Sequence, residues 1–338
     1  MFVIWKLLAI VLLALLMTGL PVAASQDDLT DLPHARQLLD HGKIDEGMVV
    51  LKELSARQPG LKGLAHAWGV AYYKKSNYSR AVPYLQEALK ESPNDKESVQ
   101  LLGLSYYFSG KTTDAIPLLE RSQSWYQAAN VDALYVLGLC YMGVQNYDAA
   151  RGAFAKMFDT PPDSAANYLF SAQMFVRHGI NVVAENYSQK AIALDPRLPL
   201  AHYLLGELYL SQLKYPEAVS ELRKEMEINP GYAGVYYKLA DAEMRLDKYE
   251  DAERLLQRSL WLDPNSTGPY ILLGKVLVKK GEFELATRML EHALTMDPNN
   301  QLSHYLLGQA YHQLGRNEDA DREFKLSEEL RQREHPKP

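Results

Sequence analysis

The 338-residue chain contains a single cysteine, Cys140, so no disulfide can form within it. Small folds stapled by several disulfides are therefore excluded, whatever the redox state of the compartment. A lone cysteine in an apolar stretch is most often a small buried hydrophobe, and the alternative is a reactive thiol or a bridge between two chains. Nothing near Cys140 in the sequence resembles the surroundings of a nucleophile.

Clustered positive charge is also missing. The 36 Lys and Arg residues are outnumbered by 42 Asp and Glu residues, and the formal net charge is −6. Binding to nucleic acid or to an anionic lipid surface needs a face on which positive charge is concentrated. The sequence therefore argues against nucleic acid and anionic lipid as partners.

Motifs that build catalytic or metal sites are absent from the sequence. It has no His-Glu-x-x-His, no Cys-x-x-Cys, no phosphate-binding glycine loop and no Gly-x-Ser-x-Gly. His304 and His312 share one helical stretch, but eight residues separate them by about 12 Å along a helix, too far to share a metal ion. Paired carboxylates such as Glu328 and Glu329 are interpreted as solvated surface. We therefore expect no enzyme activity, no cofactor and no metal ion.

An internal repeat dominates the chain. It recurs every 34 residues, as from Gly69 to Gly103, with one step of 35 residues from Gly103 to Gly138. Three columns of small or helix-breaking residues mark it. The first column is Gly69, Gly103, Gly138, Ala172, Gly206, Ala240, Gly274 and Gly308. The second column is Ala81, Ala115, Ala150, Ala184, Ala218, Ala252, Ala286 and Ala320. The third column is Pro59, Pro93, Pro162, Pro196, Pro230, Pro264 and Pro298.

Each repeat unit predicts two helices. Apolar residues recur at spacings of three and four, as in residues 201–210 and again in residues 215–224. Glycine costs about 1 kcal/mol in a helix interior relative to alanine, so its recurrence requires a compensating gain. We expect that gain to be close approach of the second helix, with the alanine column lying opposite the glycines. The prolines cannot continue a helix, so they end one helix pair and begin the next.

This pattern resembles the tetratricopeptide repeat, in which a small residue, an aromatic three residues later, an alanine and a closing proline recur. The resemblance rests on Gly69/Tyr72/Ala81/Pro93, Gly138/Tyr141/Ala150/Pro162 and Gly206/Tyr209/Ala218/Pro230. It implies an all-α fold, a right-handed superhelical solenoid of antiparallel helix pairs. The solenoid is expected over residues 25–334, in nine units near 28–61, 62–95, 96–130, 131–164, 165–198, 199–232, 233–266, 267–300 and 301–334, followed by a polar tail at 335–338.

The N-terminus has the pattern of a secretory signal. Lys6 is followed by an uncharged, leucine-rich run from Leu7 to Ala24, and small residues precede Ser25. Cleavage after Ala24 and retention of residues 7–24 as a membrane anchor both fit this pattern. The sequence predicts an exported protein, periplasmic or secreted. Three Asn-x-Ser/Thr sequons, at Asn77, Asn186 and Asn265, would matter only in a eukaryotic secretory pathway.

In the tetratricopeptide family the first helices of successive pairs line a concave groove, and the resemblance implies the same here. One column of this face is Tyr135, Leu169, Tyr203, Tyr237, Ile271 and Tyr305. Seven residues further on, about two helical turns away, lie Met142, Val176, Leu210, Met244, Val278 and His312. Tyrosine and methionine are enriched where proteins hold partners, and packing between neighbouring first helices is the alternative. Glu207 and Asp241 add negative charge to this face.

The sequence thus predicts a non-catalytic scaffold or adaptor that binds a peptide segment or assembles a complex. Its partner would carry an apolar or aromatic segment, with a basic residue placed against Glu207 and Asp241. A structural solenoid that self-assembles, or an accessory subunit of an envelope enzyme or secretion machine, are the alternatives. The partner's identity and the oligomeric state do not follow from the sequence.

Overall fold

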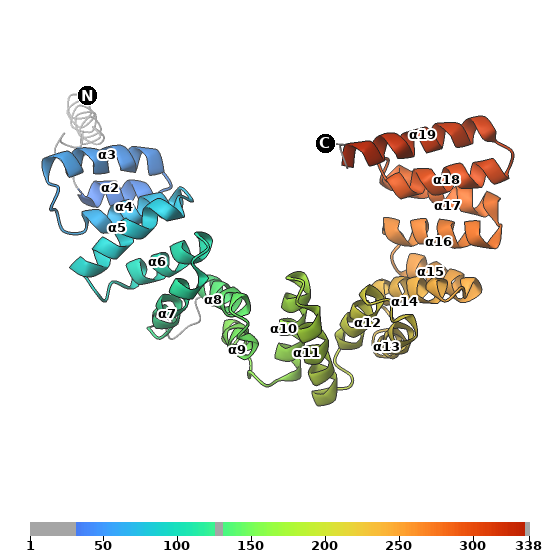
Figure 1. The fold of residues 1–338 in the computed structure, drawn as a ribbon, viewed down its shortest axis with the longest axis horizontal. Coiled ribbons are helices and arrows are strands. Elements are labelled where there is room, and N and C mark those ends of the chain that lie inside the picture. Colours follow the sequence, from blue (N-terminus) through green and yellow to red (C-terminus); the bar gives the residue numbers. More distant parts are fainter. Residues whose placement is uncertain (1–31, 126–130, 335–338) are drawn as a thin grey trace, which may run out of the picture. The chain divides into compact units, whose positions relative to one another are not determined.

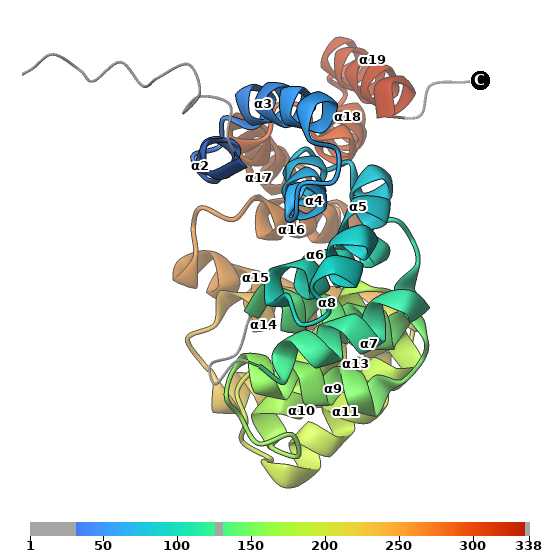
Figure 2. The ribbon, with the colours of Figure 1, turned by 90° about the vertical axis from the view of Figure 1, so that its left-hand side faces the viewer.

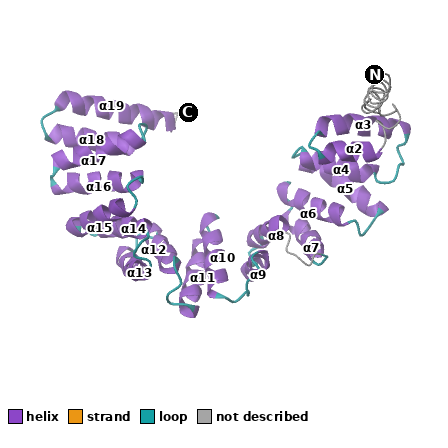
Figure 3. Cartoon of the chain, turned by 180° about the vertical axis from the view of Figure 1, so that it is seen from behind, coloured by secondary structure: helices purple, strands orange, loops and turns teal. Residues whose placement is uncertain are grey.

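A computed structural model describes residues 32–125 and 131–334. Eighteen α-helices make up its regular structure, and over these residues there is no β-strand (Figure 3). The all-α class and the architecture of repeated helix pairs are confirmed. None of the helices in the described ranges is both long and apolar enough to span a bilayer. The predicted signal or anchor at residues 1–24 and the tail at 335–338 lie outside the described residues.

The helices pair in chain order, and the chain divides into two compact units, Met1–Asp159 and Thr160–Pro338 (Figure 1). Figure 2 shows the helix pairs of the first unit following one another from α2 to α9. Those helices are α2 (Leu32–Asp40) and α3 (Ile44–Arg57), α4 (Leu64–Lys74) and α5 (Tyr78–Glu91), α6 (Lys96–Phe108) and α7 (Thr112–Gln123), and α8 (Val131–Gly143) and α9 (Tyr147–Met157).

The second unit contains five helix pairs. They are α10 (Ala165–Arg177) and α11 (Asn181–Leu194), α12 (Ala201–Ser211) and α13 (Tyr215–Ile228), α14 (Ala233–Arg245) and α15 (Tyr249–Leu262), α16 (Thr267–Lys280) and α17 (Phe283–Met296), and α18 (Gln301–Gln313) and α19 (Asn317–Glu334).

In the first unit, and from α12 onward in the second, the first helices of successive pairs form one layer. α2 contacts α4, α4 contacts α6 and α6 contacts α8; in the second unit α12, α14, α16 and α18 contact one another in the same way. No comparable contact joins second helices anywhere in the described ranges. Helices on the inner side of a curved stack lie closer together than those outside it, so the first helices lie on the inner side of each unit. We call this the first-helix layer.

The glycine column makes room for a large side chain of the second helix. A Cβ built on Gly206 would lie 2.6 Å from Cγ of Leu222, and one on Gly274 would lie 2.5 Å from Cγ of Leu290. Leu222 and Leu290 are fully buried and lie four residues beyond the alanine column. The expectation that alanines lie opposite the glycines is therefore corrected: a leucine or phenylalanine fills the space that the missing Cβ leaves.

The alanine column is buried along its whole length, with exposed fractions from 0% at Ala81 to 1% at Ala320.

A further column, which the sequence patterns did not reveal, lies at the turn inside each helix pair. One residue per turn has a positive φ: Gly42, Ser76, Gly110, Gln145, Gly179, Leu213, Asp247, Gly281 and Gly315. Glycine adopts this left-handed conformation without steric cost, whereas in other residues it raises the free energy of the folded state.

The closing prolines have a second role. The carbonyl of Pro196 accepts a hydrogen bond from Nε2 of His202 at 3.2 Å, and that of Pro298 accepts one from His304 at 3.1 Å. Tyr236 donates its hydroxyl to the carbonyl of Pro230 at 3.0 Å. In these three repeats a side chain six residues after the proline thus ties the entering loop to its first helix.

Candidate protein-binding surfaces

The predicted tyrosine column lies on the first-helix layer with varied exposure. Tyr305 on α18 is 44% exposed, whereas Tyr135, Tyr203, Tyr237 and Ile271 are half-buried. Tyr237 and Ile271 pack against the hydrophobic core of the second unit. Tyr305 therefore offers a partner the largest free surface of this column.

Three members of the predicted groove belong to the core instead. Met142, Leu169 and Met244 are each less than a tenth exposed, and Leu210 is half-buried against a core cluster. Met142 on α8 and Met244 on α14 belong to first helices that contact a neighbouring first helix, so side chains that point toward that neighbour become enclosed. These residues hold the repeats together and present little surface to a partner.

Tyr203 is fixed by its neighbours. Its ring meets that of Tyr232 edge-on at 5.2 Å, and its hydroxyl donates to Oε1 of Glu207 at 3.1 Å. Burial, the Glu207 carboxylate and Tyr232 together raise the pKa of Tyr203 above its ordinary value. Burial likewise raises the pKa of Tyr237, with Asp241 adding to the effect and Lys238 opposing it. Both phenols therefore remain neutral hydrogen-bond donors.

The two carboxylates of this face already have cationic partners. Glu207 forms an ion pair with Lys238 at 2.9 Å, and Asp241 forms one with Arg245 at 3.2 Å. Burial opposes charge on Lys238, but the hydrogen bond to Glu207 outweighs it and raises the pKa of this ammonium group. A basic residue of a partner would have to compete with Lys238 and Arg245 for these carboxylates.

The aromatic residues of the repeat pattern have a role that the sequence did not predict. A second-helix side chain contacts the residue at this position in the next first helix: Gln86 donates to Tyr106 at 2.7 Å, and Tyr311 donates to Glu291 at 2.6 Å. Tyr141 donates to Glu120 in the same way. Where α14 carries Glu243 instead of tyrosine, Arg223 of α13 pairs with it at 2.6 Å. These contacts join consecutive repeats.

Glu243 is fully buried, and its second carboxylate oxygen has no hydrogen bond of good geometry. Nζ of Lys248 lies 3.3 Å from that oxygen, so the two form an ion pair even though their alignment is poor. Two cations thus compensate one buried carboxylate, as a buried charge requires.

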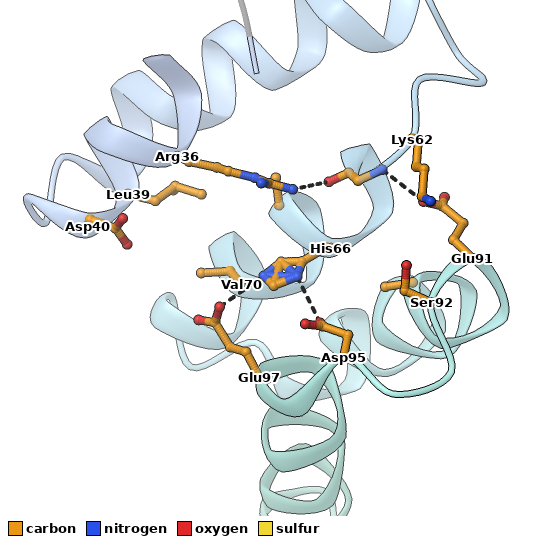
Figure 4. Close-up of a pocket in the computed structure, with 13 residues that line it drawn as sticks. Arg36, Leu39, Asp40, Lys62, His66, Val70, Glu91, Ser92, Asp95 and Glu97 are labelled. Atoms are coloured by element: carbon orange, nitrogen blue, oxygen red, sulfur yellow. Dashed lines mark hydrogen bonds and ion pairs between the residues drawn. The ribbon is translucent and has the colours of Figure 1, made fainter. Parts of the chain in front are cut away.

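The first unit contains a polar pocket of about 420 Å³ between α2, α4 and the loop that leads into α6 (Figure 4). His66 lies between two carboxylates, with Nδ1 3.1 Å from Asp95 and Nε2 3.2 Å from Glu97. Glu91 accepts the backbone N–H of Gly63 at 2.8 Å. These polar groups of the pocket therefore satisfy one another.

Four aromatic residues, of which Phe108 is exposed and three tyrosines are half-buried, gather elsewhere in the first unit. Tyr73 on α4, Tyr78 at the start of α5, and Tyr107 and Phe108 at the end of α6 touch ring to ring at centroid distances from 4.6 to 5.5 Å. We call these four residues the aromatic patch. No sequence pattern singled them out, although Tyr107 and Tyr73 precede Met142 by 35 and 69 residues and occupy the same column of the repeat.

No group of three His, Cys, Asp or Glu residues within the described ranges is arranged to hold a metal ion. Cys140 is fully buried, and burial raises the pKa of its thiol to about 12. A neutral, enclosed thiol is a poor nucleophile, so Cys140 acts as a packing residue in the core of the first unit.

Three family models match the chain. The model described as anaphase-promoting complex, cyclosome, subunit 3 matches residues 74–157 and 183–259. The model described as TPR repeat matches residues 274–315, and the tetratricopeptide repeat model matches residues 303–333.

Among curated proteins, superkiller complex protein 3 of Homo sapiens is 25% identical over 233 residues, which are 56% of this chain and 15% of that protein. Small glutamine-rich tetratricopeptide repeat-containing protein 2 of Mycosarcoma maydis is 28% identical over 102 residues, 30% of this chain and 29% of that protein. The chain therefore spans a small part of the length of the curated relatives it matches.

Among solved structures, PilF of Pseudomonas aeruginosa aligns with a TM-score of 0.49 and 22% identity, covering 62% of this chain and 93% of that one. YrrB, described as a TPR protein with an unusual peptide-binding site, aligns with a TM-score of 0.48 and 23% identity, covering 55% of this chain and 95% of that one.

Proposed function

We propose that this chain, which is a tetratricopeptide repeat protein, is a non-catalytic scaffold that binds a segment of a partner protein or holds proteins together in a complex. Proteins of this family generally mediate contacts between proteins. The observation that carries the proposal is the first-helix layer, which presents partly exposed aromatic rings at a repeated position, most fully at Tyr305.

The chemistry of this layer favours a partner with an apolar or aromatic segment. Its rings offer large contact areas at low cost in conformational entropy, and its carboxylates are already paired with Lys238 and Arg245. Apolar contact would therefore supply most of the binding energy, and charge would set orientation. Self-assembly of the chain through stacking of its ends, and service as an accessory subunit, are the alternatives.

We also propose that the protein works in an exported compartment, periplasmic or secreted. The support is the leucine-rich run from Leu7 to Ala24 behind Lys6. Mass spectrometry of the N-terminal peptide from the native host tests this. A mature chain that begins at Ser25 would support cleavage, whereas an intact N-terminus in the soluble cytosolic fraction would contradict export.

Site-directed photocrosslinking in the native host tests the binding surface. A photoreactive phenylalanine analogue at position 305 of the first-helix layer should capture a partner protein. The same analogue in place of Trp261, which lies on second helix α15 and is 70% exposed, is the matched control. Adducts from position 261 but none from position 305 would contradict the assignment of the binding surface to the first-helix layer.

A further inference from the structure

The aromatic patch of the first unit is an unusual surface for a folded chain. Phe108 is 47% exposed, and its ring stacks on Tyr78 at 4.6 Å while meeting Tyr107 edge-on at 5.2 Å. Tyr73 extends the patch by an edge contact with Tyr78 at 5.5 Å. The tyrosines are half-buried, so one side of each ring is anchored and the rest remains accessible. An exposed phenylalanine ring in contact with partly accessible tyrosine rings is the kind of apolar surface that can bind a partner.

The hydroxyl groups of the patch differ from those of Tyr106 and Tyr141 in the same unit. The hydroxyls of Tyr106 and Tyr141 form hydrogen bonds with the preceding repeat. The hydroxyls of Tyr73, Tyr78 and Tyr107 make no hydrogen bond with any residue that the structure describes. Burial raises the pKa values of Tyr73 and Tyr107, so these hydroxyls stay protonated and can donate.

The charge beside the patch is negative. Asp132 at the start of α8 acts electrostatically on Tyr73, is exposed, and forms no ion pair with a described residue. The two lysines that follow Tyr73 in the chain are already engaged: Lys74 donates to the carbonyl of Leu39 at 2.8 Å, and Lys75 pairs with Asp45. The patch therefore combines stacking faces, free donors and one uncompensated carboxylate.

A polyproline II helix matches these three features. It has no internal hydrogen bonds, so its carbonyls are open to external donors, and its proline rings pack on aromatic faces. It repeats every three residues, about 9 Å, so a row of four touching rings can contact more than one proline. A basic residue next to the prolines would complement Asp132.

We propose that the aromatic patch binds a proline-rich segment of a partner protein in the polyproline II conformation, with a basic residue of that segment placed against Asp132. This inference rests on the proposed function and names the chemistry of one partner segment. Segments rich in alanine or glycine would bind poorly, because they lose more conformational entropy on becoming extended and offer no ring to stack.

Fluorescence anisotropy with the full chain tests the inference. The probe is a labelled peptide of six prolines followed by arginine, and the matched peptide has alanine in place of each proline. The proline probe should bind saturably, and at least about tenfold more tightly than the alanine peptide, as expected for a preorganised ligand on stacking residues. Equal affinity of the two peptides, or no saturable binding of the proline probe, would overturn the proposal.

Single substitutions locate the site. Tyr107→Phe keeps the ring and removes only the hydroxyl, so it should weaken probe binding about fivefold without disturbing the fold. Phe108→Ala should weaken it about tenfold or more, and Asp132→Asn should reduce affinity for the arginine probe but not for six prolines alone. Trp261→Ala, which removes an exposed aromatic of the second unit, should leave binding unchanged.

Loss of binding in Trp261→Ala equal to that in Phe108→Ala would show nonspecific contact and contradict the site. The proposed function and this inference can fail separately. Capture of a partner from position 305 without binding of the proline probe would leave the scaffold role standing and remove the proline-rich partner.

Discussion

Replacing Gly206 by alanine tests the packing of the repeat directly. The added Cβ would lie 2.6 Å from Cγ and 2.9 Å from Cδ2 of Leu222. Carbon atoms in contact prefer about 3.5–4.0 Å, so the overlap is about 1 Å. Leu222 is fully buried beside Ala218, which leaves it little room to move.

Two opposing effects determine the magnitude. Alanine improves helix propensity by about 1 kcal/mol over glycine, whereas overpacking a tight core costs about 1–3 kcal/mol. We therefore expect Gly206→Ala to destabilise the protein by up to about 2 kcal/mol. Gly152 in α9 supplies the control, because a Cβ there would meet nothing within 4 Å. Gly152→Ala should stabilise the protein by up to about 1 kcal/mol.

Urea denaturation followed by circular dichroism measures both changes. A double-mutant cycle with Leu222→Ala then isolates the contact. Leu222→Ala alone should cost about 2–5 kcal/mol, and the pair should cost less than the sum because the clash disappears. If Gly206→Ala were as stabilising as Gly152→Ala, or strictly additive with Leu222→Ala, the packing argument would be refuted.

Three further predictions concern the turns, the charges and the binding surface. Leu213 is 69% exposed with a φ of 61° at a turn position that five other repeats fill with glycine, so Leu213→Gly should raise stability by about 1 kcal/mol in the same denaturation assay. Burial opposes ionisation of Glu221, but hydrogen bonds from His202 and Lys224 hold its pKa below the ordinary 4.5. As pH falls, the Glu221 carboxylate of the unfolded chain is therefore protonated before that of the folded chain. The stability that Glu221 contributes is lost as pH falls below about 4.5. The melting temperature of Glu221→Gln should therefore fall less steeply below this pH than that of the wild type. Tyr305→Ala should weaken partner binding by about 1–2 kcal/mol with little change in melting, whereas Tyr203→Ala should also lower the melting temperature because its ring packs against Tyr232.

Each of these has a contrary result. Gly281→Leu, the reverse change at the same turn position, should destabilise the protein. An unchanged urea denaturation curve for this variant would show that the positive φ carries no cost for leucine. If the melting temperature fell with pH equally in the wild type and in Glu221→Gln, protonation of this carboxylate would not be linked to folding. If calorimetry showed equal melting losses for Tyr305→Ala and Tyr203→Ala, Tyr305 would be a packing residue.

The candidate binding surface was predicted only in part. The repeated spacing correctly marked the first helices, and Tyr305 is exposed there as a binding residue must be. Methionine is common in adaptable interfaces, yet Met142 and Met244 are buried between first helices. Residue type and helical spacing cannot distinguish a side chain facing a partner from one facing the next repeat, because both lie on the same side of their own helix.

The sequence by itself determined the features that depend on local spacing. The 34-residue period, the helix pairs and the boundaries at proline follow from periodicity and from backbone restrictions that act within a few residues. The tertiary structure decided the contacts between segments. Leu222 rather than Ala218 fills the space at Gly206, and Gln86 reaches Tyr106 in the next repeat. These pairings depend on the separation and rotation of two packed helices, which set which side chains meet across 16 or 20 residues of chain.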